Sequence, residues 1–166
     1  MSATASAEQV ARFLYEEARW LDEREWDLWL ALYAPDAVFH LPAWRDEAHL
    51  TTDPDTEVSQ IYHDSRRGLE ERVARVRSGK SVTALPLPRA THFVSNVLSE
   101  PRPDGALTVR ANWMVQVYQP RTARQHVNFG RYEYVLSDRD GAFVIRRKMI
   151  VLNNDCVPTL VDFYTL

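Results

Sequence analysis

The chain has 166 residues, a formal net charge of −3 and a pI of about 5.9. This balance provides no basic field for nucleic acid or an anionic membrane, and no apolar run approaches the roughly 20 residues of a membrane span. One cysteine, Cys156, excludes an internal disulfide framework, and the first residues lack the pattern of a secretory signal. We therefore expect a cytoplasmic protein with a single domain over residues 1–166.

The first part of the chain has the pattern of helices. Ser6 and Gln9 have the spacing of a capping box, and apolar residues then recur at helical spacing as far as Pro35, which cannot continue a helix. The pattern predicts helices within residues 6–35. A short apolar run at 37–41 predicts the first strand.

Residues 42–60 have no sustained hydrophobic period and contain two prolines among many aspartate and threonine residues. A loop of this length in a compact domain is usually functional or forms an interface. Gly68 is expected to be a turn residue. After it, apolar residues at i, i+4 and i+7 predict a helix over about 69–78.

The second half of the chain changes to a period of two residues. Apolar and polar side chains alternate through LTVRANWMVQVY at 107–118, which is the strongest strand pattern in the sequence. Turn-rich segments separate it from similar stretches and predict four antiparallel strands over about 90–155, with Gly130 at a bend or bulge. Helices followed by such a meander indicate an α+β fold, with a curved antiparallel sheet packed on the N-terminal helices.

The sequence contains few of the residues that metal-binding or nucleotide-binding sites require. A Rieske cluster needs two cysteines and two histidines, and structural zinc usually needs four such ligands, so one cysteine excludes both. The five histidines include no pair at i, i+3 or i, i+4, although distant residues could still assemble a mononuclear iron site. The five glycines form no nucleotide-binding motif. We interpret Cys156 as a buried, inert thiol rather than a nucleophile.

General acid–base chemistry is an open alternative. A curved sheet closed by helices encloses a cone, and an Asp–His pair inside it could move protons without a cofactor. Asp36 and His40 flank the expected first strand and point to the same side, about 13 Å apart by strand rise. The simpler interpretation is that Asp36 ends a helix and that His40 faces solvent or a neighbour.

Titratable side chains are crowded in the segment before and within the expected third helix. A tyrosine, a histidine, an aspartate and two arginines fall within six positions, and further arginines follow along the helix. Arginine is favoured in interface ion pairs and bidentate contacts, so this run is a candidate surface for a partner. A solvated helix face is the alternative interpretation.

Three segments, in this order, carry a family resemblance: YAPDAVFHLPAW at 33–44, DPDTEVSQIYHDSRRGLEERVARV at 53–76 and PRATHFVSNV at 88–97. Together they resemble the small (β) subunits of aromatic-ring-hydroxylating dioxygenases, most of all the benzoate and anthranilate type. The resemblance covers nearly the whole chain. Its segments mark the fold and the interfaces of that family, and none is a catalytic motif.

The resemblance implies the cone-shaped α+β fold shared with nuclear transport factor 2, ketosteroid isomerase and scytalone dehydratase. It also implies an α3β3 hexamer with a large (α) subunit, in which the small subunits self-associate as a trimer. In that family the large subunit holds a Rieske [2Fe–2S] centre and a mononuclear Fe(II), and a separate reductase supplies electrons from NADH. None of these cofactors is expected in this chain.

The function implied is that of a structural subunit, without catalytic, cofactor-binding or metal-binding residues, in an oxygenase that dihydroxylates an aromatic carboxylate during aromatic catabolism. The alternative is a free-standing, cofactor-independent isomerase or lyase that uses Asp36 and His40 inside the cone. For the structural subunit, the residues expected at an interface are Trp44, Tyr62, Arg66, Arg67 and Arg72.

Overall fold

The first helix, α1 (Ala7–Asp22), begins at the predicted capping box. Ser6 Oγ accepts a hydrogen bond from the Gln9 main-chain N–H at 3.1 Å, and Gln9 Oε1 accepts one from the Ser6 N–H at 2.8 Å. These two bonds satisfy amide groups that the first turn of a helix leaves without partners. A shorter helix, α2 (Trp26–Ala31), follows after one tight turn.

The first strand, β1 (Tyr33–Pro42), begins earlier than expected. Ile145 donates its N–H to Leu32 O at 2.8 Å, so the chain joins the sheet directly after α2. The pairing is then irregular around Pro35, because proline has no N–H to contribute to the ladder. The predictions that the helical region reaches residue 35 and that Asp36 ends a helix are therefore wrong.

The sheet has six strands in the order β2-β1-β6-β5-β4-β3. The last four strands form the expected antiparallel meander, but β1 runs parallel to β6. The connection between β1 and β6 includes a helix and several strands, which is long enough for a parallel return. The sheet is therefore mixed rather than wholly antiparallel, and its other strands are β2 (Ser59–His63), β3 (Arg89–Pro101), β4 (Leu107–Gln119), β5 (Arg124–Arg139) and β6 (Ala142–Leu152).

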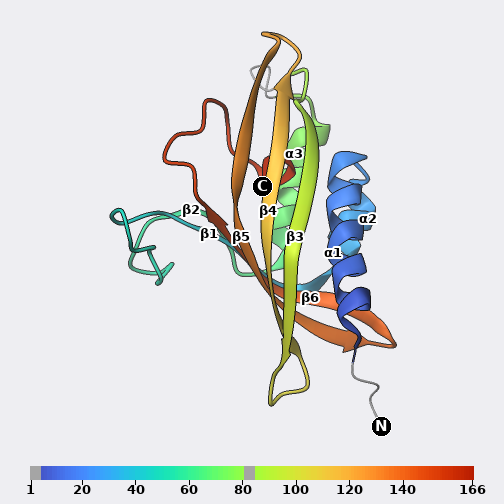
Figure 1. The fold of residues 1–166 in the computed structure, drawn as a ribbon. Helices are drawn as coiled ribbons and strands as arrows, with labels where there is room; N and C mark the ends of the chain where they lie inside the picture. Colours follow the sequence, from blue (N-terminus) through green and yellow to red (C-terminus); the bar gives the residue numbers. More distant parts are fainter. Residues whose placement is uncertain (1–4, 81–84) are drawn as a thin grey trace.

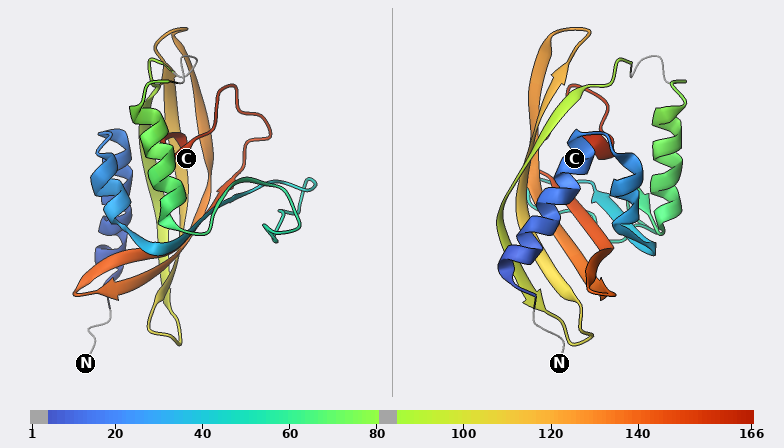
Figure 2. Two further views of the ribbon diagram at one scale, coloured as in Figure 1. Left: turned by 180° about the vertical axis from the view of Figure 1, so that it is seen from behind. Right: turned by 90° about the vertical axis from the view of Figure 1, so that its right-hand side faces the viewer.

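The helices lie on one side of the curved sheet and the opposite side of β3, β4 and β5 is left open (Figure 1, Figure 2). This computed structural model describes residues 5–80 and 85–166. Within those ranges, no helix has the length and apolar content needed to cross a membrane. Alternate residues of β4 point toward the helices and form the middle of the core, namely Val109, Ala111, Trp113, Val115 and Val117.

Two glycines allow close approaches rather than the features expected of them. Helix α3 (Arg66–Arg77) begins before residue 69 and includes Gly68, where a β-carbon would overlap the His63 ring. Gly130 pairs in regular register, and a β-carbon there would overlap Val151 O on the neighbouring strand. Gly68 is thus not a turn residue and Gly130 marks no bulge.

The segment after β6 folds back between the helices and the sheet, which the sequence did not indicate. Phe163, in a short 3₁₀ helix, η2 (Phe163–Thr165), stacks on the Trp29 ring with 4.9 Å between ring centroids. Asn128 Nδ2 donates to Thr165 O at 3.0 Å. The side chains of η2 are buried, so this segment fills space inside the cone.

A candidate partner-binding surface

Residues 43–58, which we name the arm, project from the β1–β2 edge of the sheet (Figure 1). They make up most of the predicted 42–60 loop, which β1 and β2 shorten at its ends. Trp44 forms an isolated bridge with Leu50 at the base of the arm, and its indole Nε1 donates to Leu152 O at 2.7 Å. Trp44, a predicted interface residue, therefore fastens the arm to the end of β6.

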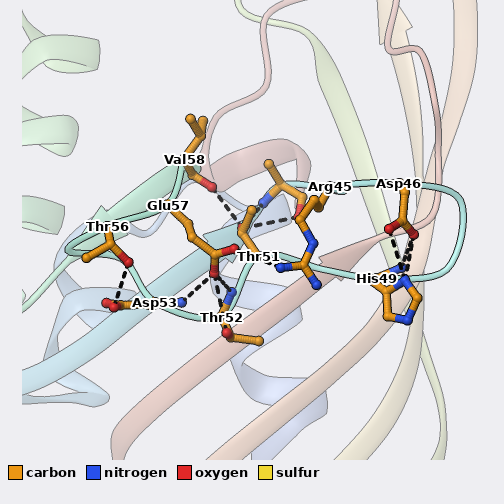
Figure 3. Close-up of polar contacts among 10 residues, drawn as sticks. Arg45, Asp46, His49, Thr51, Thr52, Asp53, Thr56, Glu57 and Val58 are labelled. Atoms are coloured by element: carbon orange, nitrogen blue, oxygen red, sulfur yellow. Dashed lines mark hydrogen bonds and ion pairs between the residues drawn. The ribbon is translucent and has the colours of Figure 1, made fainter.

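The arm is exposed, but hydrogen bonds among its own residues hold it in one conformation (Figure 3). Glu57 Oε2 accepts hydrogen bonds from the main-chain N–H groups of Thr52 at 2.7 Å and Asp53 at 3.0 Å. Its other carboxylate oxygen accepts one from Arg45 Nη1 at 3.2 Å. Glu57 thus connects both sides of the arm.

Two aspartates fix the turns of the arm in a similar way (Figure 3). Asp46 Oδ1 accepts from the N–H of Ala48 at 2.9 Å and lies 2.7 Å from His49 Nδ1. Asp53 Oδ2 accepts from Thr56 Oγ1 at 2.7 Å. A projecting segment that is already ordered loses less conformational entropy when it binds a partner.

Acidification is expected to loosen the arm. Hydrogen bonds from the amides of Asp53 and Thr52 lower the pKa of Glu57 below its ordinary 4.5, and those from Ala48 and Thr56 lower the pKa values of Asp46 and Asp53, respectively, below 3.8. A lowered pKa stabilises the ordered arm fully above the ordinary value, and this contribution is lost as the pH falls through the lowered value.

Amide hydrogen-exchange protection factors of Thr52 and Asp53 provide the measurement. We expect constant protection from pH 7 to about 5 and a decrease below about 4. Glu57→Gln serves as the control and should show the lower protection already at pH 7. Equal protection at pH 3 and pH 7 in the unmodified chain would contradict the prediction.

Two of the predicted interface residues, outside the arm, are open to solvent. Arg67 leaves 83% of its side chain exposed and pairs with Glu71 on the next turn of α3 at 3.2 Å. Tyr62 is also exposed, on the edge strand β2. Both side chains are therefore available to a partner.

The other two predicted arginines contact this chain's own fold. Arg66 Nη1 donates to Tyr33 O at 3.0 Å. Arg72 donates from Nε to His63 Nε2 at 2.7 Å and from Nη1 to Asp162 Oδ1 at 3.0 Å. Burial, and then the charge of Arg72, lower the pKa of His63, which suits a neutral ring that accepts this hydrogen bond. Arg72 in particular joins α3 to the segment after β6.

The structure does not bring the candidate acid–base residues together. Asp36 is exposed and its Oδ2 lies 3.7 Å from Arg146 Nη2. His40 is buried against its neighbours, with Nε2 3.0 Å from Ser59 Oγ and its ring edge-on to Tyr62. Burial lowers the pKa of His40. Neither residue therefore belongs to an Asp–His pair inside the cone.

The interior instead holds an ion pair that sequence reasoning missed. Lys148 Nζ donates to Glu17 Oε1 at 2.8 Å, and the hydroxyl groups of Tyr33 and Tyr134 donate to the same carboxylate at 2.7 and 2.6 Å. Burial raises the pKa of Glu17, but the charge of Lys148 and these hydrogen bonds more than offset it and lower the pKa. The ammonium also lies over the Tyr132 ring, 4.3 Å from its centroid.

A signal for this pair was present in the sequence. Glu17 lies at helical spacing from Leu14 and Leu21, on the apolar face of α1, and Lys148 shares the inward face of β6 with Ile150. A charged residue at an apolar position of a periodic pattern indicates a buried polar partner. The sequence did not indicate that Glu17 and Lys148 contact each other.

An Asp–His contact does exist elsewhere, between α1 and β3. Asp22 Oδ1 lies 2.6 Å from His92 Nδ1, and His92 Nε2 lies 3.0 Å from Leu166 O. Both ring nitrogens therefore face atoms of the chain itself. Phe163 and the Glu17 network are also buried inside the cone and contact residues of the same chain, and neither Asp36 nor His40 takes part in these contacts.

The side chains present do not form a metal centre in the part of the chain that the structure describes. No group of three or more His, Cys, Asp or Glu residues within it is arranged to hold a metal ion. Cys156 is exposed in the irregular segment after β6, so the prediction of a buried thiol is wrong. The features open to other molecules include the arm, Tyr62, Arg67 and the outer face of the sheet.

Comparison with known proteins identifies the family. The family model described as "Ring hydroxylating beta subunit" matches residues 16–159. The chain belongs to this family. This ring-hydroxylating β subunit is 40% identical over 161 residues to the β subunit of benzoate 1,2-dioxygenase from Acinetobacter baylyi, covering 97% of this chain and 94% of that one.

Solved structures agree with this assignment. The β subunit of benzoate 1,2-dioxygenase from Burkholderia mallei superimposes with a TM-score of 0.82 at 34% identity, covering 99% of each chain. A scytalone dehydratase-like protein from Novosphingobium aromaticivorans gives a TM-score of 0.67 at 12% identity over 87% of this β subunit and 82% of that chain, which shows a shared fold alone. The predicted family resemblance and cone-shaped α+β fold are confirmed.

Proposed function

We propose that this β subunit is a non-catalytic, structural component of a terminal oxygenase that dihydroxylates an aromatic carboxylate of the benzoate type. The observation that carries the proposal is the match along nearly the full length to β subunits named for benzoate 1,2-dioxygenase. The interior of the cone supports it, because the buried side chains Glu17, Lys148 and Phe163 bond to or stack on residues of this chain.

In this proposal the cofactors belong to other chains. The large subunit holds the Rieske [2Fe–2S] centre and the mononuclear Fe(II), and a separate reductase passes on electrons from NADH. The donor set of this β subunit does not fit either iron site, since its one cysteine is exposed and its described histidines and carboxylates form no ligand group. We therefore assign no chemical step to its residues.

The proposed assembly is an α3β3 hexamer in which β subunits also associate with one another as a trimer. The ordered, projecting arm supports this, because a structural subunit needs surfaces that are shaped before they meet a partner. Exposed Tyr62, on the strand that follows the arm, and exposed Arg67, in the first turn of α3, offer further surface. Trp44 contributes by fixing the arm's position.

Turnover of benzoate tests the catalytic part of the proposal. With reductase, NADH and oxygen present, the β subunit alone should form no dihydrodiol, and the complex with its large subunit should form it steadily. Product formed by the β subunit alone would overturn the structural assignment. A complex that contains both subunits and iron and is inactive on benzoate and on its ring-substituted carboxylates would instead show that the substrate class is wrong.

A further inference from the structure

The arm presents negative charge that its own structure does not use. Three of its five carboxylates hold the turns described above, whereas the carboxylates of Glu47 and Asp55 are exposed and form no hydrogen bond or ion pair within the described ranges. Arg45, the one arginine in the arm, is paired with Glu57. Val58 is 73% exposed at the end of the same segment. The arm therefore offers an acidic surface together with an apolar side chain.

The outer face of the sheet, opposite the helices, carries a row of exposed apolar side chains. Phe93, Met114 and Phe129 are register partners on three adjacent strands, and they are 52%, 40% and 45% exposed. Beside this row lies a hollow of about 240 Å³ whose lining includes Arg110 and Arg131. A contiguous apolar surface with a polar rim is typical of a protein-binding site.

The same face carries cations without counter-charges. Arg110 is paired with Glu133 at 3.5 Å, but Arg131 and Arg147 are exposed and form no ion pair with any residue in the described ranges. Register places Arg131 opposite Val151, and Arg147 lies four residues before Val151 on β6, so both guanidinium groups are on this face. Their charge complements Glu47 and Asp55 of the arm. We name Phe93, Met114, Phe129, Arg131 and Arg147 the outer-face patch.

The arm extends sideways from the β1–β2 edge of the sheet, at the opposite end of the strand order from β3, as Figure 1 and the left panel of Figure 2 show. A contact between two different surfaces of identical chains is heterologous, and it closes into a ring when the rotation between copies permits. In a ring of three, each arm meets one patch and no arm or patch is left over. A trimer therefore satisfies both surfaces at once.

We propose that the arm of each β subunit docks on the outer-face patch of a neighbouring β subunit, in a closed ring of three. The inference rests on the proposed trimeric association of β subunits and specifies the two surfaces that form it. Val58 would contact the apolar row, and Glu47 and Asp55 would pair with Arg131 and Arg147. Opposite charge across such a contact fixes the register and excludes wrong pairings.

Charge exchange tests the proposal, in the β subunit alone and in its complex with the large subunit. Glu47→Lys with Asp55→Lys is expected to weaken β self-association at least tenfold, and so is Arg131→Glu with Arg147→Glu. All four changes in one chain should restore the trimer, because opposite charges again face each other. A matched control, Glu8→Lys with Glu25→Lys, reverses two exposed carboxylates on the helix side and should leave the mass unchanged. Native mass spectrometry supplies the readout.

Cross-linking provides a second measurement that does not depend on charge. In a Cys156→Ser background, Val58→Cys combined with Phe129→Cys should give covalent dimers and trimers with a short bismaleimide, and nothing larger. Each single-cysteine chain should remain uncross-linked. Products that stop at dimers would show an isologous contact and would overturn the ring.

The outcomes separate this inference from the proposed function. If the unmodified complex contains no β trimer, both the proposed assembly and this inference are wrong. A trimer that survives the reversal of Glu47 and Asp55 would overturn the inference and leave the subunit's role intact. Release of the large subunit with the β trimer preserved would show that the arm binds the large subunit, which also overturns the inference.

Discussion

Replacing Glu17 with glutamine is expected to lower the free energy of unfolding of the β subunit by about 3–5 kcal/mol. The carboxylate is the counter-charge of Lys148, and both side chains are 2% exposed. Glutamine would leave the ammonium group buried without an opposite charge, and it would remove an ionised acceptor from Tyr33 and Tyr134. Urea unfolding followed by tryptophan fluorescence measures the change.

Two further variants control this experiment. Glu16→Gln alters a residue of the same helix whose side chain is 44% exposed and paired with Arg12, and it should change the free energy of unfolding by less than about 0.5 kcal/mol. Glu17→Gln combined with Lys148→Met removes both charges and should recover most of the lost stability. Similar, small effects at positions 16 and 17 would contradict the buried ion pair.

Replacing Phe163 with alanine is expected to destabilise the subunit by about 3–5 kcal/mol. The ring is 1% exposed, stacks on Trp29 and meets Trp26 edge-on with 5.2 Å between centroids. Truncation would open a cavity that the neighbouring tryptophans cannot fill. Urea unfolding gives the free energy, and near-ultraviolet circular dichroism should show the changed tryptophan environment.

The matched control for this variant lies three positions earlier. Leu160 is 66% exposed, so Leu160→Ala should change the free energy of unfolding by less than about 0.5 kcal/mol. An effect at Phe163 no larger than that at Leu160 would show that the segment after β6 does not hold the core together.

Local features of the fold were predictable because they depend on residues close in sequence. The capping box needs only Ser6 and Gln9, and the alternation in β4 needs only its own side chains. Long-range pairing was not predictable in the same way. The pattern at Pro35 indicated the end of a helical region. In the structure, the hydrogen bond from Ile145 N–H to Leu32 O places the chain in the sheet before that proline. Tertiary hydrogen bonds override such local signals.

The candidate site was predictable as a region and not as individual contacts. An aperiodic stretch at 42–60 indicated a functional loop, and the arm occupies it. The arginines that follow this stretch could not be told apart by residue type. Arg67 faces solvent, whereas Arg72 binds His63 and Asp162. Residue type sets what a guanidinium group can bind, and only the fold decides which partner reaches it. The outer-face patch likewise depends on the register of three strands.

The ion pair between Glu17 and Lys148 joins residues 131 positions apart. Strand β1 likewise pairs in parallel with β6, which is made much later. On the ribosome, α1 emerges long before either partner exists, so its carboxylate must stay hydrated while most of the chain is made. The packing of α1 against the sheet is therefore a late, cooperative event in folding. Contacts this distant in sequence slow folding, and the nascent chain meanwhile exposes the apolar face of α1 to chaperones.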